Sequence, residues 1–182
     1  MLTAFVVIII FFLSVQVFPV AIGIDVTGKP GKAVILIVVL SLVQVVTYWL
    51  GLKLGSTFMH LMDGFKGAVF FIGFLLIGIR MLLETINIHK SERTYSVNNV
   101  GLVILASIAQ GMNAFLVGLL FNYLSIDEKF TLIILFAITI VIATSGIIMK
   151  PNKLALSLAS LFYALGGLVM IVFAIYISFF IL

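Results

Sequence analysis

Six long apolar stretches alternate with short polar connections along the 182 residues of the chain. A helix needs about 20 apolar residues to cross the roughly 30 Å hydrocarbon core of a bilayer, and each stretch reaches about that length. The stretches cover residues 2–24, 33–52, 67–86, 100–123, 130–149 and 154–180. No connection is long enough for a soluble domain. The pattern therefore predicts an all-α integral membrane protein with six transmembrane helices in one transmembrane domain, residues 1–182.

The composition supports a membrane protein and excludes several other classes. Hydrophobic residues make up 64% of the chain and charged residues 9%, whereas soluble domains are about half apolar and a quarter charged. The chain has no cysteine, which excludes disulfides, thiolate metal sites and cysteine nucleophiles. The net charge of +4 comes from residues between the stretches, so the expected surroundings are a bilayer and no nucleic acid partner is expected. The oligomeric state stays open, a homo-oligomer included.

The lysines and arginines of the connections predict the orientation, because cytoplasmic loops carry an excess of them. Residues 1–24 hold no charge and are expected to be the first span rather than a signal peptide. The first, third and fifth connections hold six basic residues, and the second and fourth hold three. We therefore expect the odd connections in the cytoplasm and both termini outside it. The six are Lys29, Lys32, Lys90, Arg93, Lys150 and Lys153, and the three are Lys53, Lys66 and Lys129.

An internal similarity relates the first and fourth stretches at an offset of 97 residues. Gln16 falls on Asn113, Phe18 on Phe115 and Val20 on Val117. The offset amounts to three spans, so a second unit of three spans would insert the opposite way up. The offset predicts an inverted repeat of two three-helix units, residues 1–90 and 97–182. In such folds the site lies between the repeats near the middle of the membrane.

A proline interrupts the first stretch close to its only amide. Pro19 lacks an N–H group and its ring clashes with the carbonyl four residues back, which belongs to Val15. That carbonyl would then be available beside the Gln16 side chain. Backbone and side-chain oxygens together form cation sites in broken membrane helices. The other reading is a simple kink, with Gln16 bonded to a neighbouring helix.

Two further helices carry a polar face. Polar side chains recur at every third position in the second and fourth stretches, so each set lies on one face. Such faces point into the bundle, where they line a path or bond to other helices. The two sets are Ser41, Gln44 and Thr47, and Ser107, Gln110 and Asn113.

Arg80 and Glu84 are one helical turn apart in the third stretch, which predicts a structural ion pair. They form no catalytic set. Zinc-protease, nucleophile-elbow and phosphate-loop motifs are absent from the sequence, and no carboxylate pair lies inside a span. An enzyme is therefore not expected, and neither is a bound cofactor.

At these residues the chain resembles a bacterial family of six-span membrane exporters, the MntP-type manganese efflux pumps. A Ser-Met-Asp-Ala-Phe-type motif of the family corresponds to residues 14–18, and a Ser-Leu-Asp-Ala-type motif ending in Val-Gly corresponds to residues 111–118. A Gly-x-basic-Met-x-x-Glu pattern corresponds to residues 78–84. The resemblance implies a multi-pass protein of the bacterial cell (inner) membrane that exports a cation by alternating access.

The chain departs from the family at the expected metal ligands. The acids of the family fall on Gln16, Gln44 and Asn113, which keep an oxygen but lose the negative charge. Mn²⁺ favours hard oxygen ligands, carboxylates especially. The resemblance implies that these three residues hold Mn²⁺ or another cation as the substrate. The expected path beside them is lined by Val15, Pro19, Ser41, Thr47, Ser107 and Gln110. The alternative is a relative that has lost divalent metal transport and moves another small solute or acts as a membrane partner subunit.

Overall fold

A computed structural model describes residues 2–24, 30–89, 100–124 and 126–181. The described residues form helices and no strand, which confirms the all-α prediction. The helices are α1 (Leu2–Val15), α2 (Phe18–Ile22), α3 (Pro30–Phe58), the 3₁₀ segment η1 (Met59–Phe65), α4 (Lys66–His89), α5 (Val100–Phe121), α6 (Glu128–Met149) and α7 (Lys153–Phe180). Most of their bounds follow the predicted apolar stretches, because hydrophobic length determines where a membrane helix runs. The exceptions are α3, which extends beyond the predicted 33–52, and the first stretch, which is divided into α1 and α2.

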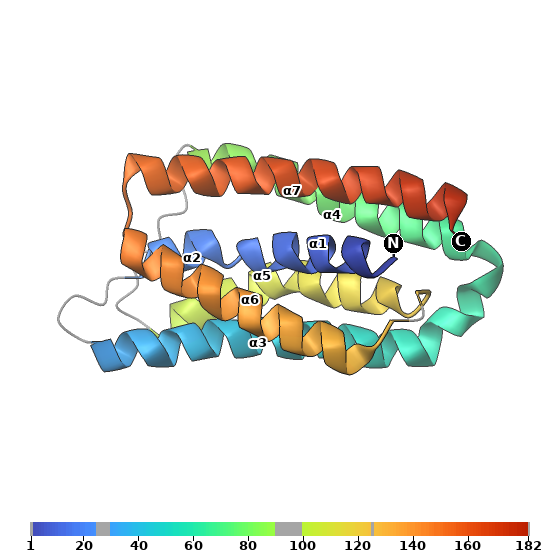
Figure 1. Ribbon diagram of the computed structural model, residues 1–182, viewed down its shortest axis with the longest axis horizontal. Helices are drawn as coiled ribbons and strands as arrows, with labels where there is room; N and C mark the ends of the chain where they lie inside the picture. The colour runs from blue at the N-terminus through green and yellow to red at the C-terminus, as the bar shows by residue number, and fades with distance from the viewer. Residues whose placement is uncertain (1, 25–29, 90–99, 125, 182) are drawn as a thin grey trace.

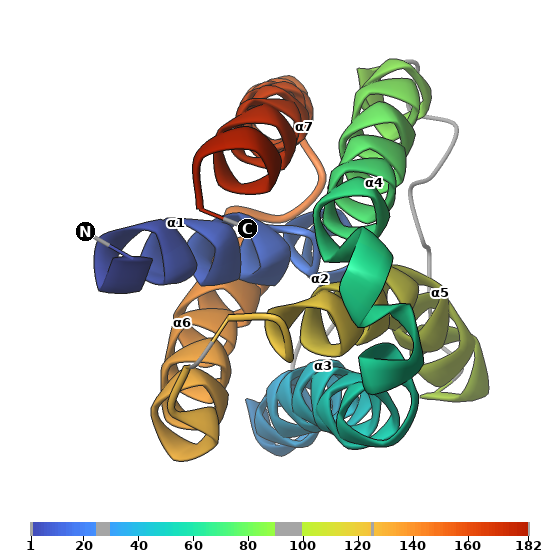
Figure 2. The same cartoon turned by 90° about the vertical axis from the view of Figure 1, so that its right-hand side faces the viewer.

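The helices form a bundle around α1 and α2. α4 packs along α7 and α3 packs along α5, while α6 contacts α1, α2 and α3. In Figure 2, α1 lies between α7 on one side and α6 with α3 on the other. Both chain termini lie at the same end of the bundle (Figure 1). The broken first segment is therefore buried among the other helices.

Five stretches of the described chain are long and apolar enough to cross a membrane. One of them, Gly31–Ile88, has 58 residues and contains α3, η1 and α4. In Figure 1, α3 and α4 run in opposite directions and η1 forms the turn between them. Met62 in η1 has non-helical backbone angles, which separates the two helices. The count of six membrane crossings and the inverted repeat stay predictions.

Glycines allow the closest helix pairs to touch backbone to backbone. A Cβ atom added at Gly118 would collide with the carbonyl oxygen of Tyr48, across the α3–α5 contact. Between α4 and α7 the contact is reciprocal. A Cβ at Gly78 would lie 2.8 Å from the carbonyl oxygen of Gly167, and a Cβ at Gly167 would lie 2.8 Å from that of Gly78. Small residues have this role in many membrane helix pairs.

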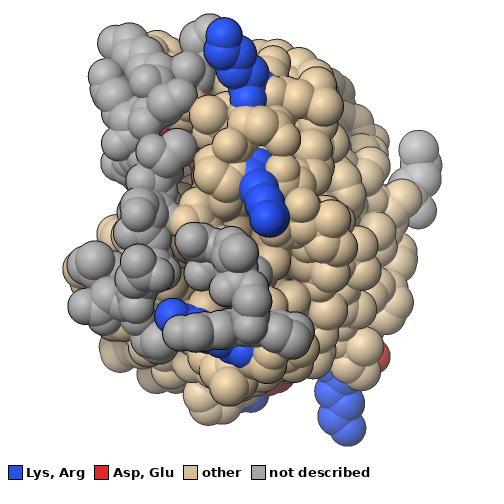
Figure 3. Space-filling model, turned by 90° about the vertical axis from the view of Figure 1, so that its left-hand side faces the viewer, with Lys and Arg blue, Asp and Glu red and all other residues tan. Residues whose placement is uncertain are grey.

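The two ends of the bundle differ in charge. At the end where α3 and α7 begin, the described charged side chains beyond or at the helix ends are lysines: Lys32, Lys150 and Lys153. Figure 3 faces this end and shows basic side chains spread over it. The end that holds both termini carries three lysines and three acids: Lys53, Lys66, Lys129, Asp63, Asp127 and Glu128. Lys29, Lys90 and Arg93, used for the predicted orientation, lie outside the described residues.

Candidate transport site

The first membrane segment breaks between α1 and α2, two residues before Pro19. Its last turn tightens, because the Gln16 N–H donates to the Leu13 carbonyl oxygen at 3.3 Å and the Val17 N–H donates to the Ser14 carbonyl oxygen at 3.1 Å. Both bonds span three residues instead of four, which is typical of a helix end. A proline at this point prevents the regular ladder from continuing. The break is fully buried inside the bundle.

Side chains from two other helices bond to the backbone at this break. The Gln44 amide of α3 donates from Nε2 to the Leu13 carbonyl oxygen at 3.0 Å. The Tyr163 hydroxyl of α7 lies 2.9 Å from the Gln16 carbonyl oxygen. The sequence predicted a free carbonyl at Val15, and the bonds from neighbouring helices end on the carbonyl oxygens of Leu13 and Gln16 instead. Buried backbone groups need such partners, so α3 and α7 stabilise the break.

Gln16 and Asn113, the pair aligned by the 97-residue offset, are in direct contact. The Asn113 amide donates from Nδ2 to Gln16 Oε1 at 2.9 Å. Asn113 Oδ1 accepts from Arg80 Nη1 at 3.0 Å, and Gln16 Nε2 donates to Met81 Sδ at 3.4 Å. Since Arg80 and Met81 are neighbours on α4, the bonds form a closed ring through α4, α5 and the α1–α2 break. We call these four residues the amide ring.

Arg80 fixes the direction of every bond in the amide ring. A guanidinium can only donate hydrogen bonds, so the atom of Asn113 that faces Arg80 must be its oxygen. The Asn113 nitrogen then faces Gln16, whose oxygen must accept. A second guanidinium bond, from Nη2 to the Ala109 carbonyl oxygen at 2.8 Å, holds Arg80 against α5. Both amide oxygens of the ring are therefore occupied as acceptors, and the ring carries the positive charge of Arg80.

Tyr163 connects Gln110 to the amide ring. The Tyr163 hydroxyl is 2.6 Å from Gln110 Oε1 as well as 2.9 Å from the Gln16 carbonyl oxygen. A hydroxyl has one hydrogen and donates to one of these acceptors at a time. The structure therefore brings four of the predicted site residues close together: Gln16, Gln44, Gln110 and Asn113.

The predicted hydroxyl residues do not join these bonds. Each bonds to the carbonyl oxygen four residues back on its own helix: Ser41 to Ile37 at 2.9 Å, Thr47 to Val43 at 2.8 Å and Ser107 to Val103 at 2.6 Å. Sequence reasoning also missed Tyr163 and Met81. Both occupy positions in apolar helices that look like ordinary packing positions. The one signal for Tyr163 is its hydroxyl group, because a buried tyrosine hydroxyl usually has a hydrogen-bond partner.

The ion pair predicted between Arg80 and Glu84 stays a prediction. The two guanidinium hydrogen bonds described above reach across to α5 and end on neutral oxygens. Arg80 therefore contributes to the contact between α4 and α5, a role that the spacing along α4 did not indicate.

Comparison with known proteins gives the family. The model of the family Mntp, described as "Putative manganese efflux pump", matches residues 28–178. This chain belongs to the Mntp family. No curated protein and no solved structure matches it. Together with its long apolar helices, the match makes the chain a membrane protein of a transporter family.

The residues matched by the family model include most, but not all, of the amide ring. Gln44, Arg80 and Asn113 lie inside the matched residues, and Gln16 and the helix break lie before them. The chain thus has the family pattern over α3–α7, and it completes the ring with a segment that the match does not include. Among the described residues, no three side chains of His, Cys, Asp or Glu gather where they could hold a metal ion.

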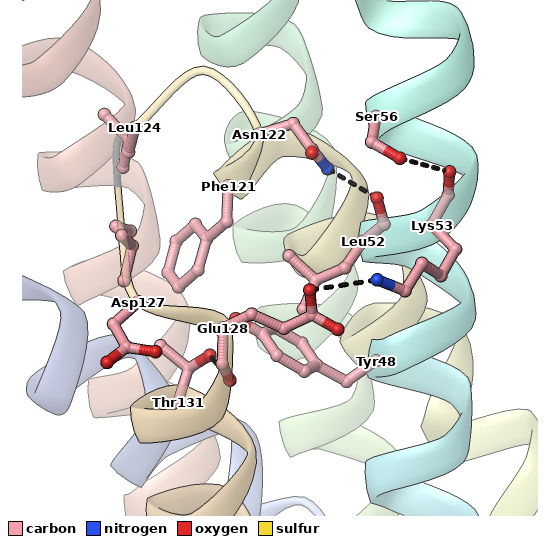
Figure 4. Close-up of a pocket in the computed structure, with 11 residues that line it drawn as sticks. Tyr48, Leu52, Lys53, Ser56, Phe121, Asn122, Leu124, Asp127, Glu128 and Thr131 are labelled. Carbon is pink, nitrogen blue, oxygen red and sulfur yellow. Dashed lines mark hydrogen bonds and ion pairs between the residues drawn. The ribbon is translucent and has the colours of Figure 1, made fainter.

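A separate cavity of about 500 Å³ opens at the end of the bundle that holds the termini. It lies between α3, the end of α5 and the start of α6, and Figure 4 shows the side chains around it. Lys53 Nζ and Glu128 Oε2 form an ion pair at 3.0 Å across its side, and Asn122 Nδ2 donates to the Leu52 carbonyl oxygen at 2.9 Å. None of the amide-ring residues lines this cavity.

Proposed function

We propose that this member of the Mntp family is a small transporter that carries its substrate by alternating access around the amide ring. The observation that carries the proposal is the bond between Gln16 and Asn113. It joins the two segments that the 97-residue offset relates, and it lies at a buried helix break. Sites of inverted-repeat transporters lie between the repeats, near such breaks. Here the first segment supplies the break, and α5 is continuous.

One contact supports an inverted repeat. When two similar units face each other about a two-fold axis, a residue near the axis meets its own counterpart and the other contacts are reciprocal. Gln16 meets Asn113 in this way. The contact joins the first half of the chain to the second.

The substrate is the point at which the chain differs from its family. The family description concerns manganese, and the resemblance assigns Mn²⁺ or another cation to the oxygens of Gln16, Gln44 and Asn113. Two of these oxygens already accept hydrogen bonds inside the amide ring. A dication about 5 Å from the Arg80 charge would also meet a repulsion of about 7 kcal/mol at an effective dielectric near 20. The geometry therefore favours the alternative substrate class, a small solute other than a bare dication.

Transport into and out of proteoliposomes tests this proposal. We expect no Mn²⁺ flux above that of empty vesicles, and flux of another small solute from a panel of anions, zwitterions and neutral molecules. Asn113→Leu should abolish that flux, whereas Asn122→Leu, an amide change at the separate cavity, should retain it. Mn²⁺ flux that depends on Asn113 would contradict the proposed substrate class. Flux that neither change affects would contradict the proposed site.

We also propose that the protein lies in the bacterial cell (inner) membrane. The end that faces the viewer in Figure 3, where α3 and α7 begin, would lie in the cytoplasm, and both termini would lie outside. The sequence supports it, because the first, third and fifth connections hold six basic residues and the second and fourth hold three. Because the chain has no cysteine, single changes Lys153→Cys and Lys53→Cys can be labelled with a membrane-impermeant thiol reagent. In intact cells we expect labelling at position 53 and protection at position 153. The reverse pattern would contradict the orientation.

A further inference from the structure

We infer that Arg80 anchors a binding site for a small anion, a carboxylate or a similar singly charged oxygen group. The inference deepens the proposed function by naming a substrate class. The claim that this anion is transported rests on the proposed function. The binding itself is a separate property of the chain and is tested separately.

The first argument is the count of donors and acceptors at the amide ring. A guanidinium has five N–H donors, and the described hydrogen bonds of Arg80 use one on Nη1 and one on Nη2. The Nε–H group and two further N–H groups are left, in the planar arrangement that pairs with a carboxylate. The two amide oxygens of the ring, Asn113 Oδ1 and Gln16 Oε1, already accept hydrogen bonds. A site with donors left over is suited to an acceptor and not to a cation.

The second argument is charge. The guanidinium hydrogen bonds end on Asn113 Oδ1 and on a backbone carbonyl oxygen, so inside the amide ring the positive charge meets no carboxylate. Asn113 presents a neutral amide oxygen to the guanidinium. An external anion would restore the charge that the side chain lacks. Guanidinium–carboxylate pairs are also about twice as strong as neutral hydrogen bonds.

The third argument is depth. Arg80 is half-buried and lies nine residues before the end of α4 at His89, which is about 13 Å along the helix axis. A guanidinium at such depth needs water or an anion beside it, because a lone charge in hydrocarbon is costly. A lipid phosphate offers the same chemistry, but headgroups lie at the membrane surface. The depth therefore favours a soluble anion.

The chain allows a direct test because it contains only two arginines, Arg80 and Arg93. Protein labelled with ¹⁵N-arginine should give two Nε–H signals by nuclear magnetic resonance, and Arg80→Lys assigns them by removing one. Acetate replaces chloride at constant ionic strength. We expect the Arg80 signal to shift and saturate in the millimolar range, while the Arg93 signal follows only the bulk change. A linear drift of both signals would overturn the inference.

Asn113→Asp is the matched variant, because it supplies the missing carboxylate from inside the protein. Its Arg80 signal should start at the shifted position, and half-saturation by acetate should need at least tenfold more anion. An unchanged acetate response in this variant would overturn the inference. Nanodiscs of phosphatidylglycerol and of phosphatidylcholine, both without acetate, test the lipid source. A shift seen only with phosphatidylglycerol and not with acetate would assign the site to a headgroup and overturn the soluble anion. Transport can fail while the acetate shift persists, so the two proposals fail separately.

Discussion

The charge of Arg80 should be coupled to position 113, and a double-mutant cycle measures that coupling. The changes are Arg80→Gln, Asn113→Asp and the two together. In the native chain Arg80 Nη1 lies 3.0 Å from Asn113 Oδ1. Asn113→Asp places a negative charge at that oxygen, so it turns a neutral acceptor into a charged one.

The magnitude follows from that distance. Charge centres about 4 Å apart attract by about 4 kcal/mol at an effective dielectric near 20. Burying the new carboxylate offsets much of this gain, so Asn113→Asp alone should change the free energy of unfolding by only about 1 kcal/mol in either direction. In the Arg80→Gln background the carboxylate loses its partner and should destabilise the protein by about 3 kcal/mol. Loss of the Asn113 Nδ2 donor occurs in both backgrounds and cancels. The expected coupling is therefore about 2–4 kcal/mol.

Unfolding of the purified protein in a denaturing detergent titration gives the four free energies. Asn122→Asp is the matched control, since Asn122 bonds to the Leu52 carbonyl oxygen and not to Arg80. Its coupling to Arg80→Gln should be below about 0.5 kcal/mol. A coupling that small for Asn113→Asp as well would refute the reasoning, because the guanidinium charge would then not act at position 113.

Three further outcomes are expected. Gly118→Ala should destabilise the protein by about 1–3 kcal/mol, because the new methyl group collides with α3. Gly64→Ala is the control, since nothing lies within 4 Å of its new methyl group, and it should change the free energy of unfolding by less than about 0.5 kcal/mol. Equal melting temperatures of the two variants would contradict the close contact. Tyr163→Phe should cost about 1–2 kcal/mol in the same unfolding titration, because it removes the hydroxyl bond at the helix break, and a neutral effect would show that the bond is dispensable. The double change Gln16→Asp and Asn113→Asp should create Mn²⁺ binding, measured by titration at two pH values, and the binding should weaken as the pH falls since metal ligands must be deprotonated. Tight binding by the native protein that this double change leaves untouched would place the metal site elsewhere.

The helices were predictable because long apolar runs need no knowledge of packing. The break was also predictable, since Pro19 prevents the regular helix from continuing whatever surrounds it. The meeting of Gln16 and Asn113 followed from the internal similarity, which relates residues that no local pattern connects. These predictions rest on chain length, backbone chemistry and repetition, all of which are present in the sequence.

The partners of the side chains could not be predicted in the same way. The spacing along α4 favoured Glu84 for Arg80, but the guanidinium donates to α5, which depends on how two helices cross. Ser41 and Ser107 lie on the predicted faces, yet each hydroxyl bonds to its own helix because the carbonyl four residues back is always within reach. Local geometry therefore competes with contacts between helices, and sequence spacing alone does not decide between them.

The closed amide ring has a mechanical consequence for α4. Arg80 and Met81 are adjacent, so their side chains leave the helix about 100° apart. One is held toward α5 and the other toward the α1–α2 break. Any rotation of α4 about its own axis lengthens at least one of these contacts, and both contacts belong to the same closed ring. The helix should therefore turn in a single cooperative step rather than gradually, which is the behaviour that a two-position switch requires.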